Sequence, residues 1–242
     1  MRTARMKAWT LARHGTPHRS LTLGEHEVPR PKAGEVLIRC EGFGLNYADV
    51  MAVKGLYREA PPLPSILGYE VVGHVEAVGI DAPPGLLGQR VVAMTRFGGY
   101  AEFAVTDHRA LAVLPAEVPL GEATALATQG CTAWYAARML CPLRSGEKVL
   151  VHSAAGGVGQ FIVQLALHAG CEVHAFASGR QKTDHLRAMG VHHVIDRGSP
   201  DPYGSLLSTL CEARLDAVFN AVGGSTFRED MRLLGAGGRL VI

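Results

Sequence analysis

The sequence feature that most constrains the fold is a turn of small residues, 154–159, between two apolar segments. Residues 149–152 have the length and composition of a buried strand, and residues 161–166 continue as an apolar helix. A strand, a glycine-rich turn and a helix in this order are the context in which a dinucleotide phosphate binds. Gly156 has no β-carbon to hold a pyrophosphate away, and Gly159 lets the helix pack on the strand. The residues that we expect to cradle the phosphate are Ala155, Gly156, Gly157, Val158 and Gly159.

The turn is a variant of the usual pattern, because Ala154 stands where G-x-G-x-x-G has its first glycine. Glycine-rich turns between a strand and a helix also occur for packing alone. The segments that follow favour binding, since residues 172–177 form a second predicted strand, after which helices and strands alternate. This alternation predicts an α/β fold, a doubly wound parallel sheet of the Rossmann type. We expect helices at 158–169, 182–189, 204–211 and 226–234, and further strands at 191–195, 216–220 and 239–242.

The first half of the chain has a β-rich pattern. Short apolar or alternating runs are separated by glycine and proline, and the proline cluster at 61–64 predicts a loop. After residue 117 the apolar spacing becomes helical, over 120–140, so we expect two domains, 1–117 and 118–242. The last predicted strand reaches residue 242, whereas doubly wound dinucleotide domains usually have about six strands. We therefore expect a truncation after the fifth strand, with a shorter five-stranded sheet as the alternative.

The end of the second predicted strand discriminates between two dinucleotides. NAD favours an acid there, because a carboxylate accepts a hydrogen bond from the ribose 2′-hydroxyl. Residues 173–182 contain no acid. Ser178, Arg180 and Lys182 instead offer a hydroxyl and two cations, which suit a 2′-phosphate. The sequence thus favours NADP(H), the alternative being that the cations only solvate a helix start, where they would oppose the helix dipole.

Five further segments carry a resemblance that covers nearly the whole chain. They are GLNYAD at 44–49, KGLY at 54–57, LGYEVVG at 67–73, GQRV at 88–91 and HSAAGGVG at 152–159. The chain resembles the quinone oxidoreductase branch of the medium-chain dehydrogenase/reductase superfamily, in particular the zeta-crystallin-like quinone reductases and the vesicle amine transport protein homologues. The enoylreductase domains of polyketide synthases are also similar. The resemblance implies a GroES-like, partly open β-barrel followed by a Rossmann domain, with cofactor and substrate bound between them.

Metal-dependent members of this superfamily hold a catalytic zinc with Cys, His and Cys. Local matching places Asn46, Tyr69 and Gln129 at these positions, and none of them is a thiolate or an imidazole. The four-cysteine lobe for a structural zinc would follow residues 90–93, where no cysteine occurs. The adjacent pair His192-His193 would point to opposite faces of a strand, so we expect no metal.

The resemblance also implies the residues around the nicotinamide and the substrate. Asn46 would be an amide donor, Asp49 a carboxylate that orients neighbours, and Tyr57 a phenol that donates to an oxyanion. The alternatives are a helix-start acid for Asp49 and a packed aromatic ring for Tyr57. On the cofactor side the resemblance adds Thr132 near the nicotinamide and Arg197 near the 2′-phosphate. At the end of the fourth predicted strand, we expect three residues near the nicotinamide ribose: Asn220, Val222 and Gly223.

Together these features predict a zinc-independent, NADPH-dependent oxidoreductase that transfers hydride to a quinone or an α,β-unsaturated carbonyl. Such acceptors are already electrophilic, so orientation and hydrogen bonds would replace a metal. Two alternatives stay open. One is a non-catalytic NADPH-binding protein of the crystallin or vesicle type, and the other is an enoylreductase domain of a polyketide synthase.

Net charge, apolar stretches and cysteine spacing limit the classes of binding partner and the cellular location that we expect. The net charge is +2 without a run of Lys or Arg, so we expect no nucleic acid. No apolar stretch approaches about 18 residues, and we expect neither a membrane span nor a secretion signal. The five cysteines are odd in number and widely spaced, which is typical of reduced thiols and a cytoplasmic location. The resemblance implies a homodimer for a full-length chain.

Overall fold

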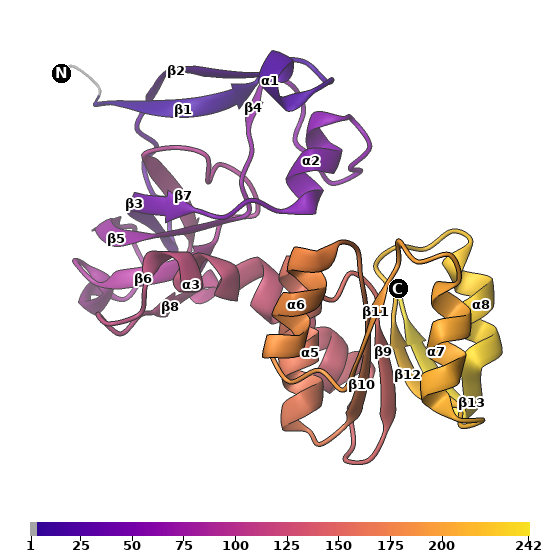
Figure 1. Ribbon diagram of the computed structural model, residues 1–242. Coiled ribbons are helices and arrows are strands. Elements are labelled where there is room, and N and C mark those ends of the chain that lie inside the picture. The colour runs from indigo at the N-terminus through magenta and orange to yellow at the C-terminus, as the bar shows by residue number, and fades with distance from the viewer. Residues whose placement is uncertain (1–3) are drawn as a thin grey trace. The chain divides into compact units, whose positions relative to one another are not determined.

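The computed structural model describes residues 4–242, which form two compact units that meet in the sequence between Thr128 and Gln129. Figure 1 shows both units, with the chain coloured from indigo at its start to yellow at its end. Within the described residues, every helix is too short or too polar to traverse a bilayer.

The first unit is built from antiparallel strands, which confirms the β-rich first half. Its larger sheet has the strand order β7-β3-β5-β6-β8, and its smaller sheet has the order β2-β1-β4. The strands are β1 (Arg5–Leu11), β2 (Leu21–Glu27), β3 (Glu35–Phe43), β4 (Ser65–Ile66), β5 (Glu70–Val78), β6 (Arg90–Met94), β7 (Phe103–Asp107) and β8 (Leu111–Val113). The helical segments are α1 (Pro17–Ser20), α2 (Tyr47–Val53), η1 (Pro84–Leu86), η2 (His108–Ala110) and α3 (Leu120–Ala125).

The core of the first unit follows from the two-residue period of its strands. Leu37 of β3 is buried on one face of the strand. Val36 and Ile38 lie on the other face, where they are buried together with Val71 and Val75 of β5. Alternate side chains of a strand point to the same face, so this face is the interior of the unit. The proline cluster at 61–64 forms a loop between α2 and β4, as predicted.

The compact first unit extends beyond residue 117, where the sequence pattern changes. Ala123 and Ala127 pack against Val72, Val92 and Leu114, so α3 shares a core with the strands that precede it. The helical stretch predicted over 120–140 continues after α3 as η3 (Leu126–Gly130), α4 (Cys131–Trp134) and η4 (Tyr135–Leu140), and η3 and η4 have π-helical geometry. The units therefore divide inside one helical stretch, at a point where helical periodicity gives no signal.

The second unit contains a parallel five-stranded sheet of the Rossmann type, which confirms the predicted fold class. The strand order β11-β10-β9-β12-β13 places β10 and β11 on one side of β9 and β12 and β13 on the other. The strands are β9 (Lys148–Val151), β10 (Glu172–Ala177), β11 (His193–Asp196), β12 (Leu215–Phe219) and β13 (Leu234–Val241). The helices are α5 (Gly157–His168), α6 (Arg180–Ala188), α7 (Pro202–Leu210) and α8 (Thr226–Leu233).

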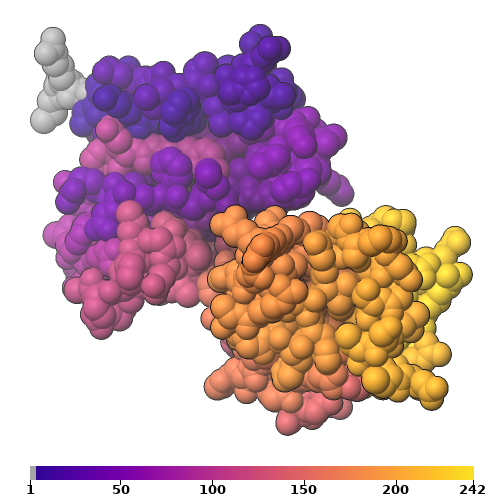
Figure 2. All heavy atoms as spheres, in the orientation of Figure 1, coloured from indigo at the N-terminus to yellow at the C-terminus, as the bar shows by residue number. Residues whose placement is uncertain are grey.

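Helices cover both faces of this sheet. On one face, Val163 of α5 and Leu186 of α6 pack against strand residues such as Val149. On the other face, Leu206 of α7 packs against Leu150. In the space-filling view, residues coloured orange, which include α6 and α7, form most of the visible surface of this unit (Figure 2). Because helices cover both faces of the sheet, the strand side chains on both faces are apolar.

The fifth strand begins earlier than predicted. β13 starts at Leu234, whereas the apolar run pointed to residue 239. Residues 235–238 are Gly-Ala-Gly-Gly, which carry almost no side chain from which a strand could be recognised. The pairing of β13 with β12 is regular from Ala217 opposite Arg239 onward and shifts register before it.

Candidate functional site

The small-residue turn lies at the carboxyl edge of the parallel sheet, directly after β9. Ser153 begins it with a φ of 49°, and α5 begins at Gly157. A β-carbon on Gly159 would lie 2.3 Å from the Ser153 carbonyl oxygen, and one on Gly156 would lie 3.1 Å from the same oxygen. Glycine is required at 159 because a backbone atom fills the space of a side chain. The first N–H groups of α5 have no partner within the helix, as at any helix start.

Beside the turn the structure forms a cavity of about 380 Å³. The ends of three strands surround it, because β9, β10 and β11 are neighbours in the sheet and end at the same edge. Five residues that the sequence analysis assigned to the cofactor line this cavity: Ala155, Gly156, Ser178, Lys182 and Arg197. Three lining residues were not assigned: Ser153, Phe176 and Ala177. The only sequence feature that could have indicated these three residues is their position next to the turn or at the end of the second predicted strand.

Arg180 does not line the cavity. Its side chain is 94% exposed, and its Nε lies 3.4 Å from Asp184 one turn further along α6. Lys182 and Arg197 thus form the cationic side of the cavity, and the backbone N–H of Arg197 donates to the Ala177 carbonyl at 2.8 Å. The remaining cavity walls are small or apolar.

A second turn leaves the carboxyl edge after β12, next to β9 in the sheet. The Asn220 side-chain oxygen accepts the N–H groups of Val222 at 2.8 Å and Gly223 at 2.9 Å. Asn220 is buried, and its amide nitrogen donates to Thr226 and to Asp230. The three predicted ribose residues therefore form one turn that a single side chain holds closed.

Sequence reasoning missed the buried group that anchors this turn. Asp230 of α8 is fully buried and lies 3.0 Å from His152 Nε2, the residue that precedes the phosphate turn. The Tyr203 hydroxyl of α7 also donates to Asp230, at 3.0 Å, and burial raises the pKa of Tyr203 well above its usual range. Asp230 thus connects the ends of β9 and β12. No local pattern marks it, since its partners lie far away in the sequence.

In the first unit, Asn46 belongs to a buried polar group that we call the Asn46–Glu70 cluster, formed by Asn46, Asp49 and Glu70. The Asn46 side-chain nitrogen donates to Glu70 Oε1 at 2.8 Å, and Glu70 Oε2 accepts the Thr128 N–H at 3.0 Å. Glu70 is fully buried, and a β-carbon on Gly44 would lie 1.8 Å from its carboxylate. Gly44 and Glu70 lie within two of the motifs that carry the family resemblance, but no sequence pattern predicted a role for them.

Asp49 lies at the start of α2 and has the geometry of a helix-start acid, which is the alternative that the sequence left open for it. Its carboxylate accepts the backbone N–H of Asn46 at 3.0 Å and that of Gly68 at 3.2 Å. Burial raises the pKa of Asp49 above its usual range, although these two hydrogen bonds partly offset the effect. The carboxylate caps α2 and ties it to the segment that precedes β5. Whether it also orients a substrate stays a prediction.

Tyr57 packs in an aromatic group with Tyr69 and Phe97. The Tyr57 and Tyr69 rings meet edge to face with centroids 6.1 Å apart, and Tyr69 lies 4.9 Å from Phe97. Burial and the neighbouring Tyr57 raise the pKa of Tyr69 far above its usual range, so its phenol keeps its proton. Two hydroxyl groups that can donate hydrogen bonds therefore lie side by side in the first unit.

The remaining predicted residues belong to the helical start of the second unit. Thr132 lies on α4, which packs against α5. Gln129 lies so close to α5 that a β-carbon on Gly157 would be 2.2 Å from its side-chain oxygen. Asn46, Tyr69 and Gln129, the residues at the expected zinc positions, are all neutral side chains with protein contacts of their own.

A parallel sheet with a glycine turn and a cationic cavity at its carboxyl edge, preceded by an antiparallel unit, defines a two-domain dehydrogenase or reductase. Comparison with known families agrees with this class. Residues 32–117 match the family described as "Alcohol dehydrogenase GroES-like domain", and residues 157–242 match "Zinc-binding dehydrogenase". The GroES-like first domain is thereby confirmed.

Similar solved structures cover nearly all of the chain. A quinone oxidoreductase of Pseudomonas syringae is 30% identical with a TM-score of 0.88, over 98% of this chain and 75% of that one. The CurK enoyl reductase is 28% identical with a TM-score of 0.89, over 97% and 73%. A mycobacterial protein, Rv1454c, solved in complex with NADPH, is 32% identical with a TM-score of 0.88, over 97% and 72%.

Curated relatives are longer than this chain. A mycocerosic acid synthase-like polyketide synthase of Mycobacterium tuberculosis is 34% identical over 87% of this chain but only 10% of its own length. Prostaglandin reductase-3 of Bos taurus is 34% identical over 89% of this chain and 56% of its own. From these matches, the chain belongs to the medium-chain dehydrogenase/reductase superfamily of oxidoreductases, in the branch that contains the quinone oxidoreductases and the enoyl reductases.

Proposed function

We propose that this protein binds NADPH at the carboxyl edge of the second unit and reduces a quinone or an α,β-unsaturated carbonyl compound without zinc. The observation that carries the proposal is the pair of cations, Lys182 and Arg197, in the cavity beside the phosphate turn. A 2′-phosphate carries the charge and the acceptor oxygens that such a pair binds, whereas a ribose hydroxyl does not.

The residues of the carboxyl edge fit a dinucleotide phosphate. Gly156 and Gly159 keep a β-carbon away from the turn, and the start of α5 offers N–H groups and the positive end of its dipole. Ser178 would donate its hydroxyl to the 2′-phosphate, and the Asn220 turn would hold the ribose of the nicotinamide. The nicotinamide ring, when bound, supplies the hydride.

For the acceptor, the first unit offers hydrogen-bond donors rather than a metal ligand set. We assign Tyr57 and Tyr69 to the oxygen that gains charge during reduction, because both are phenols and lie in one aromatic group. Asn46 supports this role through its buried bond to Glu70, which holds the start of α2. An activated alkene or a quinone needs no further polarisation, so these donors are sufficient.

The cofactor assignment is tested with Lys182→Gln, Arg197→Gln and Arg180→Gln. The first two should each weaken NADPH binding by about tenfold and leave NADH binding nearly unchanged, because only the 2′-phosphate loses a charge-assisted contact. Arg180→Gln is the matched control, since its exposed side chain pairs with Asp184. Calorimetric titration measures all three. Equal losses for NADPH and NADH, or the largest loss in Arg180→Gln, would contradict the assignment.

The acceptor is tested by following NADPH absorbance during turnover with simple quinones, with an enone and with an enoyl thioester. Turnover of quinones or enones supports the proposal. NADPH binding without turnover of any acceptor would instead indicate a binding protein of the crystallin or vesicle type.

An enoylreductase of the polyketide synthase type is the second candidate. It is favoured by the match of 87% of the chain to part of a polyketide synthase, and by the similar CurK enoyl reductase. A strong preference for enoyl thioesters carrying a pantetheine arm over free enones would support this candidate against the first.

A further inference from the structure

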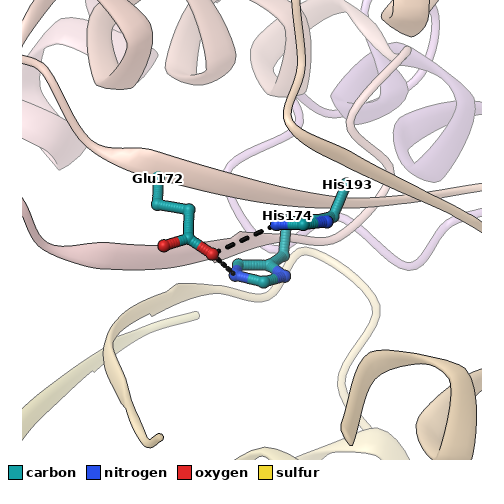
Figure 3. Close-up of side chains that lie close together, drawn as sticks. All are labelled: Glu172, His174 and His193. Atoms are coloured by element: carbon teal, nitrogen blue, oxygen red, sulfur yellow. Dashed lines mark hydrogen bonds and ion pairs between the residues drawn. The ribbon is translucent and has the colours of Figure 1, made fainter. Parts of the chain in front are cut away.

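Two histidines and a glutamate meet at the amino end of the sheet in the second unit. Glu172 and His174 lie two residues apart on β10 and share a face, and the strand register places His193 of β11 opposite His174. Within residues 4–242 the structure brings together one group of three potential metal ligands, and it is this one. Figure 3 shows one carboxylate oxygen of Glu172 reaching both imidazole rings.

The hydrogen bonds of His174 determine which of its nitrogens carries the proton. The Thr209 hydroxyl donates its single hydrogen to the Leu206 carbonyl oxygen at 2.7 Å. His174 Nδ1 lies 3.0 Å from that hydroxyl oxygen and must therefore donate to it. The neutral ring thus has its lone pair on Nε2. A metal-binding histidine has the same arrangement, since its other nitrogen usually donates to a protein acceptor.

The lone pair of His174 faces a negative charge. Nε2 lies 3.3 Å from Glu172 Oε1, without hydrogen-bond geometry, and it has no hydrogen-bond partner although the side chain is fully buried. Burial is also the main reason that the pKa of His174 is lowered to about 4, so a proton does not fill the gap near neutral pH. Two acceptors that face each other, one of them a buried imidazole nitrogen, are unfavourable unless a cation lies between them.

We propose that Glu172, His174 and His193 bind a divalent transition-metal cation of the zinc type through Oε1 and the two Nε2 atoms. Oε1 lies 3.1 Å from His193 Nε2 and 3.3 Å from His174 Nε2, and the three ligand atoms lie within 4.8 Å of one another. Ligand atoms of tetrahedral zinc are about 3.3 Å apart, given bonds of about 2.0–2.1 Å. The two imidazole rings are stacked, with centroids 4.5 Å apart and planes at 18°, so the partly exposed His193 ring would have to turn to direct its lone pair at the same ion. Water would complete the coordination.

Two of the three ligands are accessible from solvent, and a neighbouring ammonium group would compete with a bound cation for Glu172. Glu172 and His193 are about one-third exposed, so a cation reaches them from solvent. The Lys148 ammonium pairs with the other carboxylate oxygen of Glu172 and lowers the pKa of that carboxyl. Its charge opposes a bound cation, which predicts a moderate affinity that rises when Lys148 is neutralised.

This site is separate from the proposed cofactor site. Glu172 is the first residue of β10 and Ala177, which lines the cavity, is the last, so they lie about 16 Å apart along the strand. Among the histidines, only the chain neighbours His192 and His193 suggested a site from the sequence, and they do not form one. His192 does turn away, and its Nδ1 accepts the Val173 N–H at 3.1 Å. A bound cation would connect β10 to β11.

The test is a titration of the metal-stripped protein with Co²⁺, followed by visible absorption, and with Zn²⁺, followed by calorimetry. One equivalent should bind, and Co²⁺ should give the strong bands of low coordination. Glu172→Gln and His193→Ala should each bind at least tenfold more weakly, because each removes one ligand. His185→Ala is the matched control, an exposed histidine on α6 that should change nothing.

Lys148→Met separates a metal site from an ordinary network of ion pairs. It should bind the cation several-fold more tightly, whereas a purely structural role of the network predicts no gain. His174 is buried, so it is left intact, and circular dichroism verifies the fold of each variant. Absence of a stoichiometric site in the parent protein, or equal affinity in the parent and His193→Ala, would overturn the proposal.

Discussion

The carboxyl edge of the second unit and the Asn46–Glu70 cluster of the first unit are built in opposite ways. In the phosphate turn at the carboxyl edge, Gly156 and Gly159 have no side chain, and position 159 leaves no room for even a β-carbon. In the Asn46–Glu70 cluster the side chains carry the structure, and the buried carboxylate of Glu70 accepts bonds from Asn46 and Thr128. The first region should be sensitive to added volume and the second to changed polarity.

The largest effect is expected from Gly159→Ala. The new methyl group would lie 2.3 Å from the Ser153 carbonyl, so the turn and α5 must move apart. We expect a loss of about 3 kcal/mol in the free energy of unfolding and about 100-fold weaker NADPH binding. Denaturant titration and calorimetry measure the two. Gly85→Ala is the control, because nothing lies within 4 Å of a β-carbon there. Normal NADPH binding by Gly159→Ala would show that the turn does not need a residue without a β-carbon at position 159.

Glu70→Gln should have the next largest effect, and it changes polarity at constant volume. One of the two donors, Asn46 Nδ2 or the Thr128 N–H, would then face an amide NH₂ group. We expect a loss of about 2–3 kcal/mol in stability, with NADPH affinity unchanged. Denaturation with and without NADPH measures both quantities. A stability equal to that of the parent protein would mean that the cluster does not depend on its charge, and the contrast with the carboxyl edge would be lost.

The smallest expected effect concerns pH. It tests whether a buried polar side chain also controls stability in the second unit, as we expect of Glu70 in the first. His174 is a side-chain site within the second unit, and burial lowers its pKa from 6.5 to about 4. The unfolded chain binds the proton more readily, so stability is complete above pH 6.5 and falls as the pH approaches 4. Between pH 7.5 and 5.5 this group alone should cost about 1.4 kcal/mol, with chelator present.

His174→Gln is the variant that isolates this contribution, because it removes the titrating ring from its place against Glu172 and Thr209. Its stability should change less between the two pH values than that of the parent. If both proteins lost stability equally, His174 would not be the group responsible, and Glu172, whose pKa is lowered by Lys148, would be the next to test.

Local sequence reasoning succeeded where one short stretch of chain contains the whole feature. The phosphate turn and the strands and helices on either side of it occupy one continuous segment, so spacing alone predicted Gly156, Gly159 and Ser178 at one edge. Arg180 shows the limit of such reasoning. It was grouped with Lys182 by charge, but only helix geometry decides that it pairs with Asp184 and does not line the cavity.

Elements without a strong local pattern were missed. β1 and β2 have weak strand patterns, since β1 carries Arg5 and Lys7 among its apolar residues and β2 has little buried surface. Glu70 was missed as a buried group because its donors lie 24 and 58 residues away. Asp230 was missed for the same reason, with His152 a distant 78 residues from it.

The sequence by itself determined the α/β class of the second unit, the β-rich first unit and the turn at residues 154–159, because each depends on periodicity or on glycine within a short segment. Only the tertiary structure decided which polar groups are buried together. Strand register brought His193 to His174, and packing enclosed Glu70 and Asp230 with partners distant in the chain. Burial and pairing are properties of contacts across the fold, and no local spacing encodes them.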